Sequence, residues 1–528
     1  MSTVATRSFQ DIRRALLAHE ELALIDVREE DPFAQEHPLF AANIPLSKLE
    51  LEVFARVPRR DTAITLYDDG EGLAALAGER LSALGYSDVA LLQGGLAGWR
   101  AAGGELFRDV NVPSKAFGEL VESERHTPSL AAEQVQALLD AKADVVVLDA
   151  RRFDEYQTMS IPGGISVPGA ELVLRVAELA PNPATQVIVN CAGRTRSIIG
   201  TQSLVNAGIP NPVAALRNGT IGWTLAGQQL AHGQQRSFTH VSDTTRASAA
   251  QRARAVADRA TVARLDREGL AAWQADNHRT TYLFDVRTPE EYAQGHLPAS
   301  RSVPGGQLVQ ETDHVASVRG ARLVLVDDDG VRANMSASWL AQMGWQVAVL
   351  DGLSAADFSE PGDWQAPLPE QPQVSEIGVD QLHAWLQAPG TVLLDFTTSA
   401  NYVKRHIPGA HWAIRAQLPQ VLEQLPVAER FVLTCGSSLL ARFAAADLQA
   451  LTQTPVYVLE GGTARWIAAG LPLESGETHL AAARSDRYRR PYEGTDNPRE
   501  AMQGYLDWEF GLIAQLERDG THGFRVLS

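Results

Sequence analysis

The sequence repeats one pattern four times, at a spacing large enough for each copy to be a domain. In every copy an apolar stretch ends in an aspartate, and these aspartates are Asp26, Asp149, Asp285 and Asp395. They lie about 110 to 136 residues apart, which is too far for the units of a solenoid. The pattern therefore divides most of the 528 residues into four similar domains.

Further markers follow each aspartate at nearly constant distances. A second apolar stretch ends about 40 residues later, and its end markers are Asp68, Cys191, Asp328 and Cys435. A third stretch leads into a glycine turn, at Gly94, Gly219, Gly352 and Gly461. In three copies a tryptophan closes the pattern, at Trp99, Trp223 and Trp466. Markers in the same order in four copies indicate one fold that is repeated.

The stretches between the strands have the period of helices. Residues 197–207 and 440–451 show it most clearly, and Gly85, Gly208 and Gly344 are expected to end helices. Strands that alternate with helices predict a mostly parallel sheet flanked by helices. The active sites of such folds lie at the carboxyl ends of the strands. We therefore expect an α/β protein of four tandem domains.

The markers also set the expected boundaries. The four domains are placed at 8–108, 128–232, 259–370 and 374–475. Residues 236–259 are expected to form a connecting helix or a solvated linker. The carboxyl-terminal tail, 476–528, is different in kind, because it begins basic and aromatic and then takes on helical period. We expect this helical tail to dock on a domain or to join subunits in a homo-oligomer.

The second copy carries the residues best suited to chemistry. Cys191 follows an apolar run and precedes a helical stretch, so loop N–H groups and the positive end of a helix point at its sulfur. Both favour a thiolate. Arg194 and Arg196 add positive charge where an anionic donor would arrive. A cysteine that only packs as a small hydrophobe would account for the apolar run but not for this loop.

Composition limits the classes of partner. Lys and Arg number 46 against 64 Asp and Glu, and the resulting charge of −18 disfavours an extended nucleic-acid or anionic-membrane surface. Two cysteines cannot build a disulfide framework, and they fit a reducing compartment. The stretch from Met1 to Glu21 lacks the apolar core of a signal peptide, and no stretch approaches a membrane span. We therefore expect a cytoplasmic protein without nucleic-acid or membrane partners.

Taken together, these features resemble the rhodanese family of sulfurtransferases. Besides the strand ends, the cysteine loop and the glycine turn, each copy has a turn of a type that is clearest from Tyr402 to Ala410. The second copy has it from Tyr156 to Gly164 and the third from Tyr292 to Ala299, while the first has a blurred version from Phe33 to Pro45. The resemblance covers about 400 of the 528 residues.

The resemblance implies that a loop cysteine becomes a persulfide, and it makes Cys191 the expected catalytic residue. Asp68 and Asp328 stand at the cysteine position of the first and third copies, and a carboxylate cannot carry sulfane sulfur. We therefore expect these two domains to be inactive. Cys435 is a second candidate site, because Gly436 and the serine after it resemble mercaptopyruvate-type enzymes. Its loop lacks an arginine, so a structural thiol is the expected reading and a second site the alternative.

The implied reaction moves sulfane sulfur from thiosulfate or a persulfide donor through Cys191 to cyanide or a thiol acceptor. It requires no metal and no organic cofactor. Loop N–H groups would hold the sulfur, and Arg194 and Arg196 would hold the sulfonate of thiosulfate. Arg151 either lines the entrance or is tied up by Asp149. The expected substrate-binding residues are Ala192, Gly193, Arg194, Thr195, Arg196, Ser197 and Arg151.

Two other functions fit parts of the pattern. Phosphatases of related fold bind phosphate with a Cys-x5-Arg loop, but here Arg196 is the fifth residue after Cys191 and the sixth is Ser197. The loop is thus one residue too short for that cradle, and Asn190 stands where those enzymes often have His. The second rival is a non-catalytic sulfur carrier or binding scaffold, because two or three of the four copies are expected to be inactive.

Overall fold

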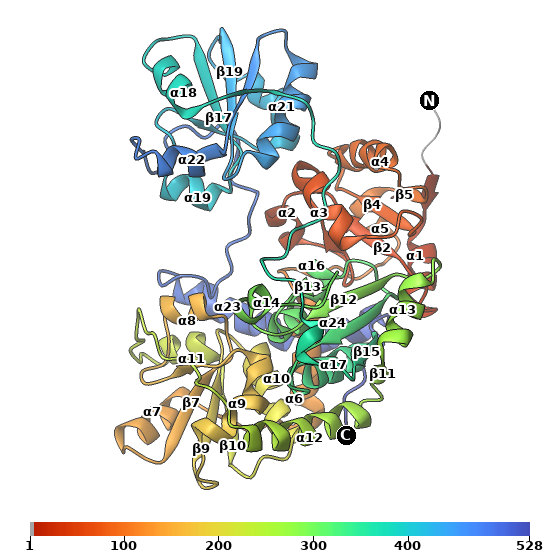
Figure 1. The fold of residues 1–528 in the computed structure, drawn as a ribbon, viewed down its shortest axis with the longest axis vertical. Coiled ribbons are helices and arrows are strands. Elements are labelled where there is room, and N and C mark those ends of the chain that lie inside the picture. The colour runs from red at the N-terminus through yellow and green to blue at the C-terminus, as the bar shows by residue number, and fades with distance from the viewer. Residues whose placement is uncertain (1–4) are drawn as a thin grey trace.

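The computed structural model describes residues 5–528, and it contains four α/β domains, each built on its own five-stranded sheet (Figure 1). The first four residues of the stretch from Met1 to Glu21 lie outside this range. Every strand pairing within the four sheets is parallel, and helices flank each sheet. The predicted fold class and the four tandem domains are confirmed.

The same strand order recurs in all four sheets. It runs β1-β5-β4-β2-β3, β6-β10-β9-β7-β8, β11-β15-β14-β12-β13 and β16-β20-β19-β17-β18. The strands are β1 (Ala5–Arg7), β2 (Ala23–Asp26), β3 (Ala42–Asn43), β4 (Ile64–Tyr67), β5 (Val89–Leu92), β6 (Ser129–Leu130), β7 (Val145–Asp149), β8 (Ile165–Ser166), β9 (Gln186–Asn190), β10 (Val213–Leu216), β11 (Ala263–Leu265), β12 (Thr281–Asp285), β13 (Arg301–Ser302), β14 (Arg322–Val326), β15 (Gln346–Leu350), β16 (Ser375–Ile377), β17 (Thr391–Asp395), β18 (His411–Trp412), β19 (Arg430–Thr434) and β20 (Val456–Leu459).

Within residues 5–528, five α-helices belong to each domain, and four more lie outside the domains. Those outside are α6 (Val112–Arg125), α12 (Asp243–Arg259), α23 (Arg499–Phe510) and α24 (Leu512–Asp519). The domain helices are α1 (Phe9–Leu17), α2 (Glu30–Gln35), α3 (Leu49–Arg56), α4 (Leu73–Ala83), α5 (Gly95–Ala101), α7 (Ala132–Asp140), α8 (Phe153–Thr158), α9 (Leu172–Leu179), α10 (Thr195–Asn206), α11 (Gly219–Leu225), α13 (Arg267–Ala275), α14 (Pro289–Gln294), α15 (Gly305–Gln310), α16 (Thr312–Val315), α17 (Arg332–Gln342), α18 (Val379–Trp385), α19 (Ser399–Lys404), α20 (Leu418–Leu422), α21 (Leu439–Leu451) and α22 (Gly462–Ala468).

Glycines end three of the helices as predicted. Gly85, Gly208 and Gly344 follow α4, α10 and α17, and each has a positive φ that a side chain would disfavour. The connecting segment 236–259 contains α12, which packs against α9 and α17 and therefore joins domains 2 and 3 rather than spanning solvent.

The strand register corrects one marker of the third domain. Asp149 pairs with Asn190, the residue before Cys191, and Asp285 pairs in the same way with Val326. The position equivalent to Cys191 is therefore Asp327, not Asp328. Three consecutive aspartates follow β14, so the sequence alone gives no sign of which one directly follows the strand.

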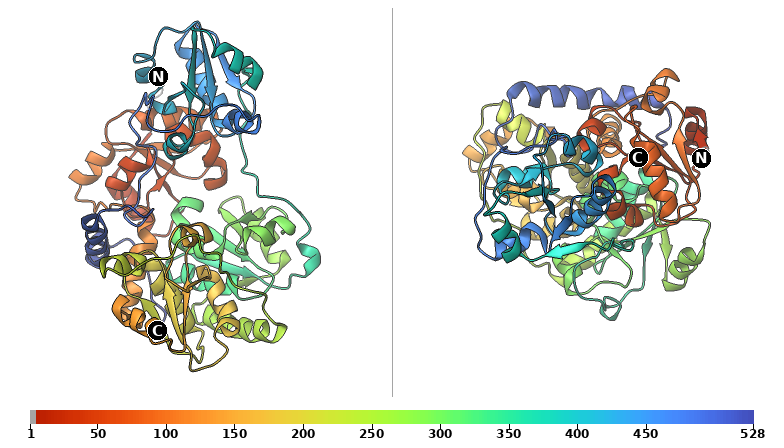
Figure 2. Two further views of the ribbon diagram at one scale, coloured as in Figure 1. Left: turned by 90° about the vertical axis from the view of Figure 1, so that its left-hand side faces the viewer. Right: turned by 90° about the horizontal axis from the view of Figure 1, so that it is seen from above.

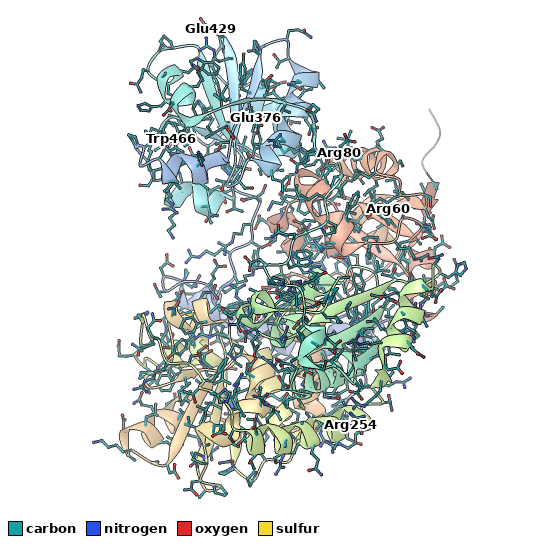
Figure 3. The ribbon with its side chains drawn as sticks, viewed as in Figure 1. Arg60, Arg80, Arg254, Glu376, Glu429 and Trp466 are labelled. Atoms are coloured by element: carbon teal, nitrogen blue, oxygen red, sulfur yellow. The ribbon has the colours of Figure 1, made fainter. Side chains whose placement is uncertain are left out.

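Domains 1 and 3 share one apolar core. Residues of both sheets, such as Ile25 and Phe284, belong to it together with Phe117 of α6 and Leu512 and Leu516 of α24. Domain 4 stands apart at one end of the molecule (Figure 1). It contacts domain 1 through ion pairs, one of them between Arg80 of α4 and Asp447 of α21 at 2.9 Å. Figure 3 labels Arg80, where domain 1 meets domain 4.

The tail returns from domain 4 to the other three domains. Its two helices, α23 and α24, lie along one side of the molecule and run from domain 2 toward domain 1 (Figure 2). α23 packs against α11 and α6, and α24 packs against α6. Of the two predicted roles for the tail, docking on its own chain is thus confirmed.

Candidate active site

The catalytic candidate Cys191 lies in the turn between β9 and α10, at the carboxyl edge of the domain 2 sheet. Its side chain is 1% exposed. The thiol donates to the Ser197 hydroxyl with a sulfur to oxygen distance of 3.3 Å, and this hydroxyl donates in turn to the Arg194 carbonyl at 2.8 Å. The loop is therefore folded around the sulfur by its own polar groups.

Burial determines the direction in which the pKa of the Cys191 thiol is shifted. Enclosure raises the pKa of this thiol above its ordinary value, and the Arg196 charge and the side chain and backbone of Ser197 oppose the rise. The sequence predicted a loop that favours the thiolate, and the groups responsible are present. Burial of the thiol acts against these groups, and no pattern in the sequence shows that the tail covers the loop.

A glycine in the neighbouring turn allows this loop to approach closely. A Cβ on Gly219 would collide with the Cys191 carbonyl and lie 2.8 Å from the Ala192 carbonyl carbon. The turn then donates from Thr220 N–H to the Cys191 carbonyl at 2.9 Å and from Ile221 N–H to the Ala192 carbonyl at 3.0 Å. The glycine marker of the repeat thus has a steric cause in this domain.

Arg196 points toward the mouth of the site. Its guanidinium donates to both carboxylate oxygens of Glu155, at 2.7 and 2.9 Å. Although burial acts in the opposite direction, the charge of Arg196 and its hydrogen bonds lower the pKa of Glu155 to about 2. Arg196 also lines a cavity of about 440 Å³ beside the loop.

Arg194 points the other way, and this arrangement does not direct it toward the predicted sulfonate. It is 4% exposed and donates to Glu119 of α6 at 2.7 and 2.9 Å. It also pairs with Glu122 and stacks on Phe510 of α23 with 4.2 Å between the guanidinium carbon and the ring centroid. Two carboxylates and a ring already satisfy this charge, so it holds α6 and α23 to the loop.

Arg151 shows both of its predicted features. Its guanidinium donates to the two Asp149 oxygens at 2.9 and 2.7 Å and to the Met159 carbonyl at 2.6 Å. It is 1% exposed, yet it lines the same cavity as Arg196. The pair with Asp149 recurs as Arg28 with Asp26 and as Arg287 with Asp285, so it belongs to the fold of three domains.

The remaining loop residues face the tail. A Cβ on Gly193 would lie 3.0 Å from Cε1 of Tyr505 and 3.3 Å from Oε2 of Glu509, both on α23. The Thr195 hydroxyl lies 3.5 Å from Oε1 of Glu509, and that oxygen also accepts from the Tyr505 hydroxyl at 2.9 Å. Gly193 is thus required for the close approach of α23, while Ala192 is buried in the turn.

Sequence reasoning missed several residues around the loop. Glu155 had a signal, because Glu291 stands at the same distance from its own strand-end aspartate and pairs with Arg332 as Glu155 pairs with Arg196. No sequence signal pointed to Glu119 or Glu509, since both belong to segments that are distant from the Cys191 loop in sequence. The tail begins with a basic and aromatic stretch at residues 484–492, but nothing in the sequence connects this stretch with Cys191.

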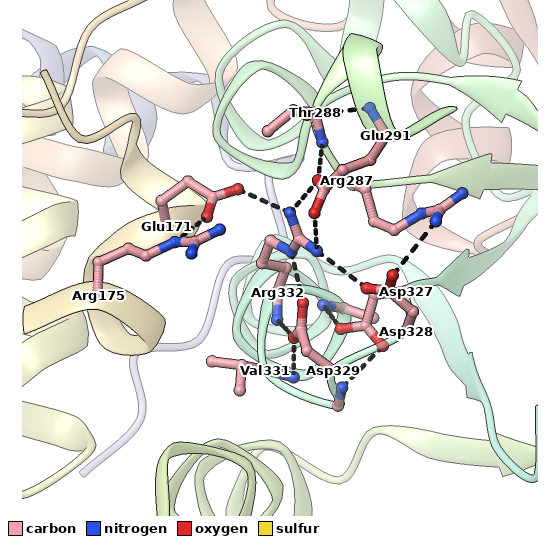
Figure 4. Close-up of polar contacts among 12 residues, drawn as sticks. Glu171, Arg175, Arg287, Thr288, Glu291, Asp327, Asp328, Asp329, Val331 and Arg332 are labelled. Atoms are coloured by element: carbon pink, nitrogen blue, oxygen red, sulfur yellow. Dashed lines mark hydrogen bonds and ion pairs between the residues drawn. The ribbon is translucent and has the colours of Figure 1, made fainter. Parts of the chain in front are cut away.

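In domains 1 and 3 a carboxylate takes the place of the sulfur. Asp68 accepts from the Ala74 N–H at 2.9 Å, and Asp327 accepts from the Ala333 N–H at 2.8 Å, six residues on in both cases. In domain 3, Arg332 further binds Asp328, Asp329, Glu291 and Glu171 of domain 2 (Figure 4). This loop is closed by its own ion pairs.

Domain 4 keeps a thiol but lacks the charges around it. Cys435 is 5% exposed, and burial raises its pKa, opposed by backbone N–H groups of Ala441, Ser437 and Leu440. No arginine stands in its loop. Asp395 has no arginine two residues on, and burial raises the pKa of this carboxyl to about 7.

Within residues 5–528, no cluster of three or more His, Cys, Asp or Glu is arranged to hold a metal ion. None of the helices in this part of the chain is long and apolar enough to cross a membrane.

Comparison with known proteins agrees with the repeat. The sequence profile of the Rhodanese-like domain matches four times, at residues 10–102, 131–226, 266–353 and 378–469. A crystal structure of a thiosulfate sulfurtransferase from Pseudomonas aeruginosa is 78% identical to this chain, with a TM-score of 0.99. The similarity covers 99% of this chain and 100% of that one.

Curated relatives match over single domains. An uncharacterised protein of Synechocystis sp. is 29% identical over 111 residues, which are 21% of this chain and 59% of that protein. An HTH-type transcriptional regulator of Mycobacterium tuberculosis is 31% identical over 90 residues, 17% of this chain and 39% of that protein. This chain thus spans about half the length of the curated relatives that it matches.

Proposed function

The chain belongs to the rhodanese family, and from that membership we propose that it is a sulfurtransferase with Cys191 as its sulfur carrier. One observation carries the assignment to Cys191. Of the four equivalent strand ends, only this one has both a thiol and a cationic side chain in its own loop. Asp68 and Asp327 have no sulfur, and Cys435 has no loop arginine. The name of the Pseudomonas aeruginosa relative supports thiosulfate as a donor.

In the first half of the reaction, the Cys191 thiolate attacks the outer sulfur of thiosulfate. The S–S bond of the donor breaks, sulfite leaves with the bonding electrons, and Cys191 becomes a persulfide. Arg196 is the charge closest to the incoming anion, because it lines the cavity while it pairs with Glu155, whereas Arg194 is enclosed by Glu119 and Glu122 and does not line it. The same charge lowers the cost of ionising the buried thiol.

In the second half, a nucleophilic acceptor attacks the outer sulfur of the persulfide. The S–S bond to Cys191 breaks, and its electrons return to Cys191 as the thiolate, while cyanide leaves as thiocyanate or a thiol leaves as a persulfide. Loop N–H groups hold the negative charge on sulfur in both halves. Because the thiol is 1% exposed, a covering group has to move before donor or acceptor reaches it.

The test is intact mass spectrometry after incubation with thiosulfate. We expect the protein to gain one sulfur atom and to lose it again on addition of cyanide. Cys191→Ser should gain none, and Cys435→Ser should behave as the unaltered protein. Sulfur retained by Cys191→Ser but lost in Cys435→Ser would assign the reaction to domain 4 instead.

A cytoplasmic location also belongs to this proposal. Both cysteines are free, which fits a reducing compartment. Localisation of the tagged protein by fractionation tests it, and recovery outside the cytoplasm would contradict it.

A further inference from the structure

Glu509 is a buried carboxyl group that the tail places against the Cys191 loop. It lies on α23 and is 0% exposed. Its Oε1 accepts from the Tyr505 hydroxyl at 2.9 Å and lies 3.5 Å from the Thr195 hydroxyl. Its Oε2 would lie 3.3 Å from a Cβ on Gly193, and it has no hydrogen-bond partner among the described residues. Buried polar atoms without a partner are rare in folded proteins.

The cations near Glu509 are already paired with other carboxylates. Arg194 of the loop donates to Glu119 at 2.7 and 2.9 Å, and Lys115 of α6 lies 2.5 Å from Asp109. Within residues 5–528, Glu509 itself forms no ion pair. Because a buried carboxylate without a cation is costly, this group holds its proton more firmly than an exposed carboxyl does.

The groups around Glu509 determine the pH at which it ionises. Burial and nearby Glu119 raise the pKa of Glu509 to about 8, while Lys115, Tyr505 and Arg194 act against that rise. The carboxyl is therefore expected to be protonated at neutral pH. The titratable and charged groups around it are Lys115 and Glu119 of α6, Cys191 and Arg194 of the loop, and Tyr492 and Tyr505 of the tail.

The charge of Glu509 acts on the sulfur of Cys191. Burial is the largest cause that raises the pKa of the Cys191 thiol, and the charge of Glu509 adds to it, whereas Arg196 and Ser197 oppose the rise. The influence is mutual, so a negative sulfur makes the ionisation of Glu509 harder. The thiol and the carboxyl therefore compete for one negative charge beneath α23.

We propose that Glu509 is a positioning residue for Cys191: while it keeps its proton, the enclosed loop can carry negative charge on the sulfur, and once ionised it opposes that charge. This inference rests on the proposed role of Cys191 as the sulfur carrier and adds a residue of the tail to the site. It applies to the thiolate that attacks the donor and to the anion of the persulfide. A thiol with a carboxylate has as many protons as a thiolate with a carboxylic acid, so exchange between these states needs no further reactant.

Titration of the thiolate by its ultraviolet absorbance tests the proposal while the loop is closed. The background is Cys435→Ser, in which Cys191 is the remaining cysteine, and addition of Cys191→Ser gives the baseline for tyrosine ionisation. The amide in Glu509→Gln is neutral like the protonated acid, and its oxygen can still accept from Tyr505. We expect the thiolate of this variant to form at lower pH and in one step, whereas Glu509 should spread its formation over two coupled steps. Identical titration curves would overturn the proposal.

Two alkylating reagents separate the charge of Glu509 from any loosening of α23. Iodoacetate and iodoacetamide react at the same methylene carbon, but only iodoacetate is an anion. The ratio of their rates with Cys191 therefore cancels the thiolate fraction and the opening of the cover. From about pH 7 to about pH 9 the ratio should fall about three- to tenfold in Cys435→Ser, because one negative charge is added near the sulfur.

The same ratio should stay constant when Glu509→Gln is added. It should still fall with Glu500→Gln, the matched control on the exposed side of the same helix. A constant ratio in the protein that retains Glu509 would overturn the proposal without the need for a variant. An equal fall in Glu509→Gln would assign the charge to another group and would also overturn it.

Sulfur uptake from thiosulfate, followed by intact mass, separates this inference from the proposed reaction. Glu509→Gln should load Cys191 as fast as the unaltered protein at about pH 6, and about three- to tenfold faster at about pH 9. Equal rates at both pH values, in a protein that does gain sulfur, would overturn the role of Glu509 alone. The expected thiolate titration, in a protein that gains no sulfur, would support that role and contradict the sulfur transfer.

Discussion

The two arginines of the Cys191 loop carry the same charge but have different partners. Arg194 is enclosed by Glu119, Glu122 and Phe510, and all of these approach from helices outside domain 2. Arg196 pairs with Glu155 of its own domain and faces the cavity. At the scale of single residues, one arginine is therefore part of the packing between segments, and the other, although paired with Glu155, borders the cavity.

Replacing each arginine by alanine should separate these roles. Arg196→Ala should lower kcat/KM for thiosulfate about 10- to 150-fold, since it removes a charged contact. Arg194→Ala should destabilise the protein by about 3–5 kcal/mol, because it leaves buried carboxylates without a cation. Steady-state kinetics and urea unfolding measure the two effects. A larger kinetic loss in folded Arg194→Ala than in Arg196→Ala would contradict the assignment.

The residue types at the site could be predicted from the sequence, but the direction in which each side chain points could not. The spacing of the repeat and the charges of its loop pointed to Cys191 and to both arginines. Glu119 lies far from Arg194 in sequence, and no local pattern shows that α6 will cross the loop. In the third copy the marker was placed at Asp328 instead of Asp327, because three consecutive aspartates do not show which one directly follows the strand.

At the scale of elements, the loop that carries the cysteine is held in place by the glycine turn that follows the next strand. In domain 2 the turn at Gly219 approaches the Cys191 carbonyl, and in domain 4 the turn at Gly462 makes the same approach to Cys435. In domain 3, β15 ends at Leu350 as β10 ends at Leu216, so Leu353 stands at the position of Gly219. The cysteine loops of domains 2 and 4 therefore have a close contact with the turn that leaves no room for a side chain at its glycine.

Gly352, one residue before Leu353, also has a positive φ but has open space where a Cβ would stand, so it supplies a control variant. Gly219→Ala should displace the Cys191 loop and abolish sulfur uptake, because the added Cβ collides with the loop backbone. Gly352→Ala should cost only about 1–2 kcal/mol, the strain of a left-handed alanine, since both glycines have a positive φ. Mass spectrometry after thiosulfate treatment and urea unfolding check the pair. Sulfur uptake by Gly219→Ala at the normal rate would refute the steric argument.

The docking of α23 should depend on pH through Glu509. Burial, together with nearby Glu119, raises the pKa of this carboxyl to about 8. The folded protein then holds a proton that the unfolded chain releases near its ordinary value of 4.5. The contribution of Glu509 to the free energy of unfolding should therefore fall from about pH 5 to pH 8, by up to about 1.4 kcal/mol per unit.

Glu509→Gln should flatten that dependence. Urea unfolding at several pH values measures it as the difference between the variant and the unaltered protein, because other buried carboxyls add slopes of their own. Glu500→Gln, on the exposed side of the same helix, is the control. An unchanged slope in Glu509→Gln would show that this carboxyl is ionised when folded.

At the scale of the whole molecule, the tail makes one unit of domains that are distant in sequence. α24 completes the core shared by domains 1 and 3, and α23 covers the loop of domain 2. The segment between domain 4 and α23 supplies Arg490 to the cavity. The cover of Cys191, part of the cavity wall and part of the shared core thus belong to one continuous stretch of chain, so a mutation in the core should change the exposure of the Cys191 sulfur.

Leu512→Ala should show this connection. Leu512 is fully buried, and its truncation should cost about 2–5 kcal/mol. In a Cys435→Ser background, Cys191 should also react faster with a thiol reagent, because α23 is held less firmly. Leu451→Ala, at an exposed position of domain 4, should change neither quantity. Destabilisation without faster labelling of Cys191 would mean that α23 stays in place independently of α24.

With Cys191 as the proposed sulfur carrier, its enclosure should also affect how long a persulfide survives there. A persulfide open to solvent is reduced by any thiol that collides with it, so its cargo would leak at a rate set by the surrounding thiol concentration. With the sulfur 1% exposed beneath α23, that leak is limited instead by how often the cover opens. Formation of the persulfide and transfer of its sulfur would then be separate events, because an acceptor reaches the sulfur only when the cover opens.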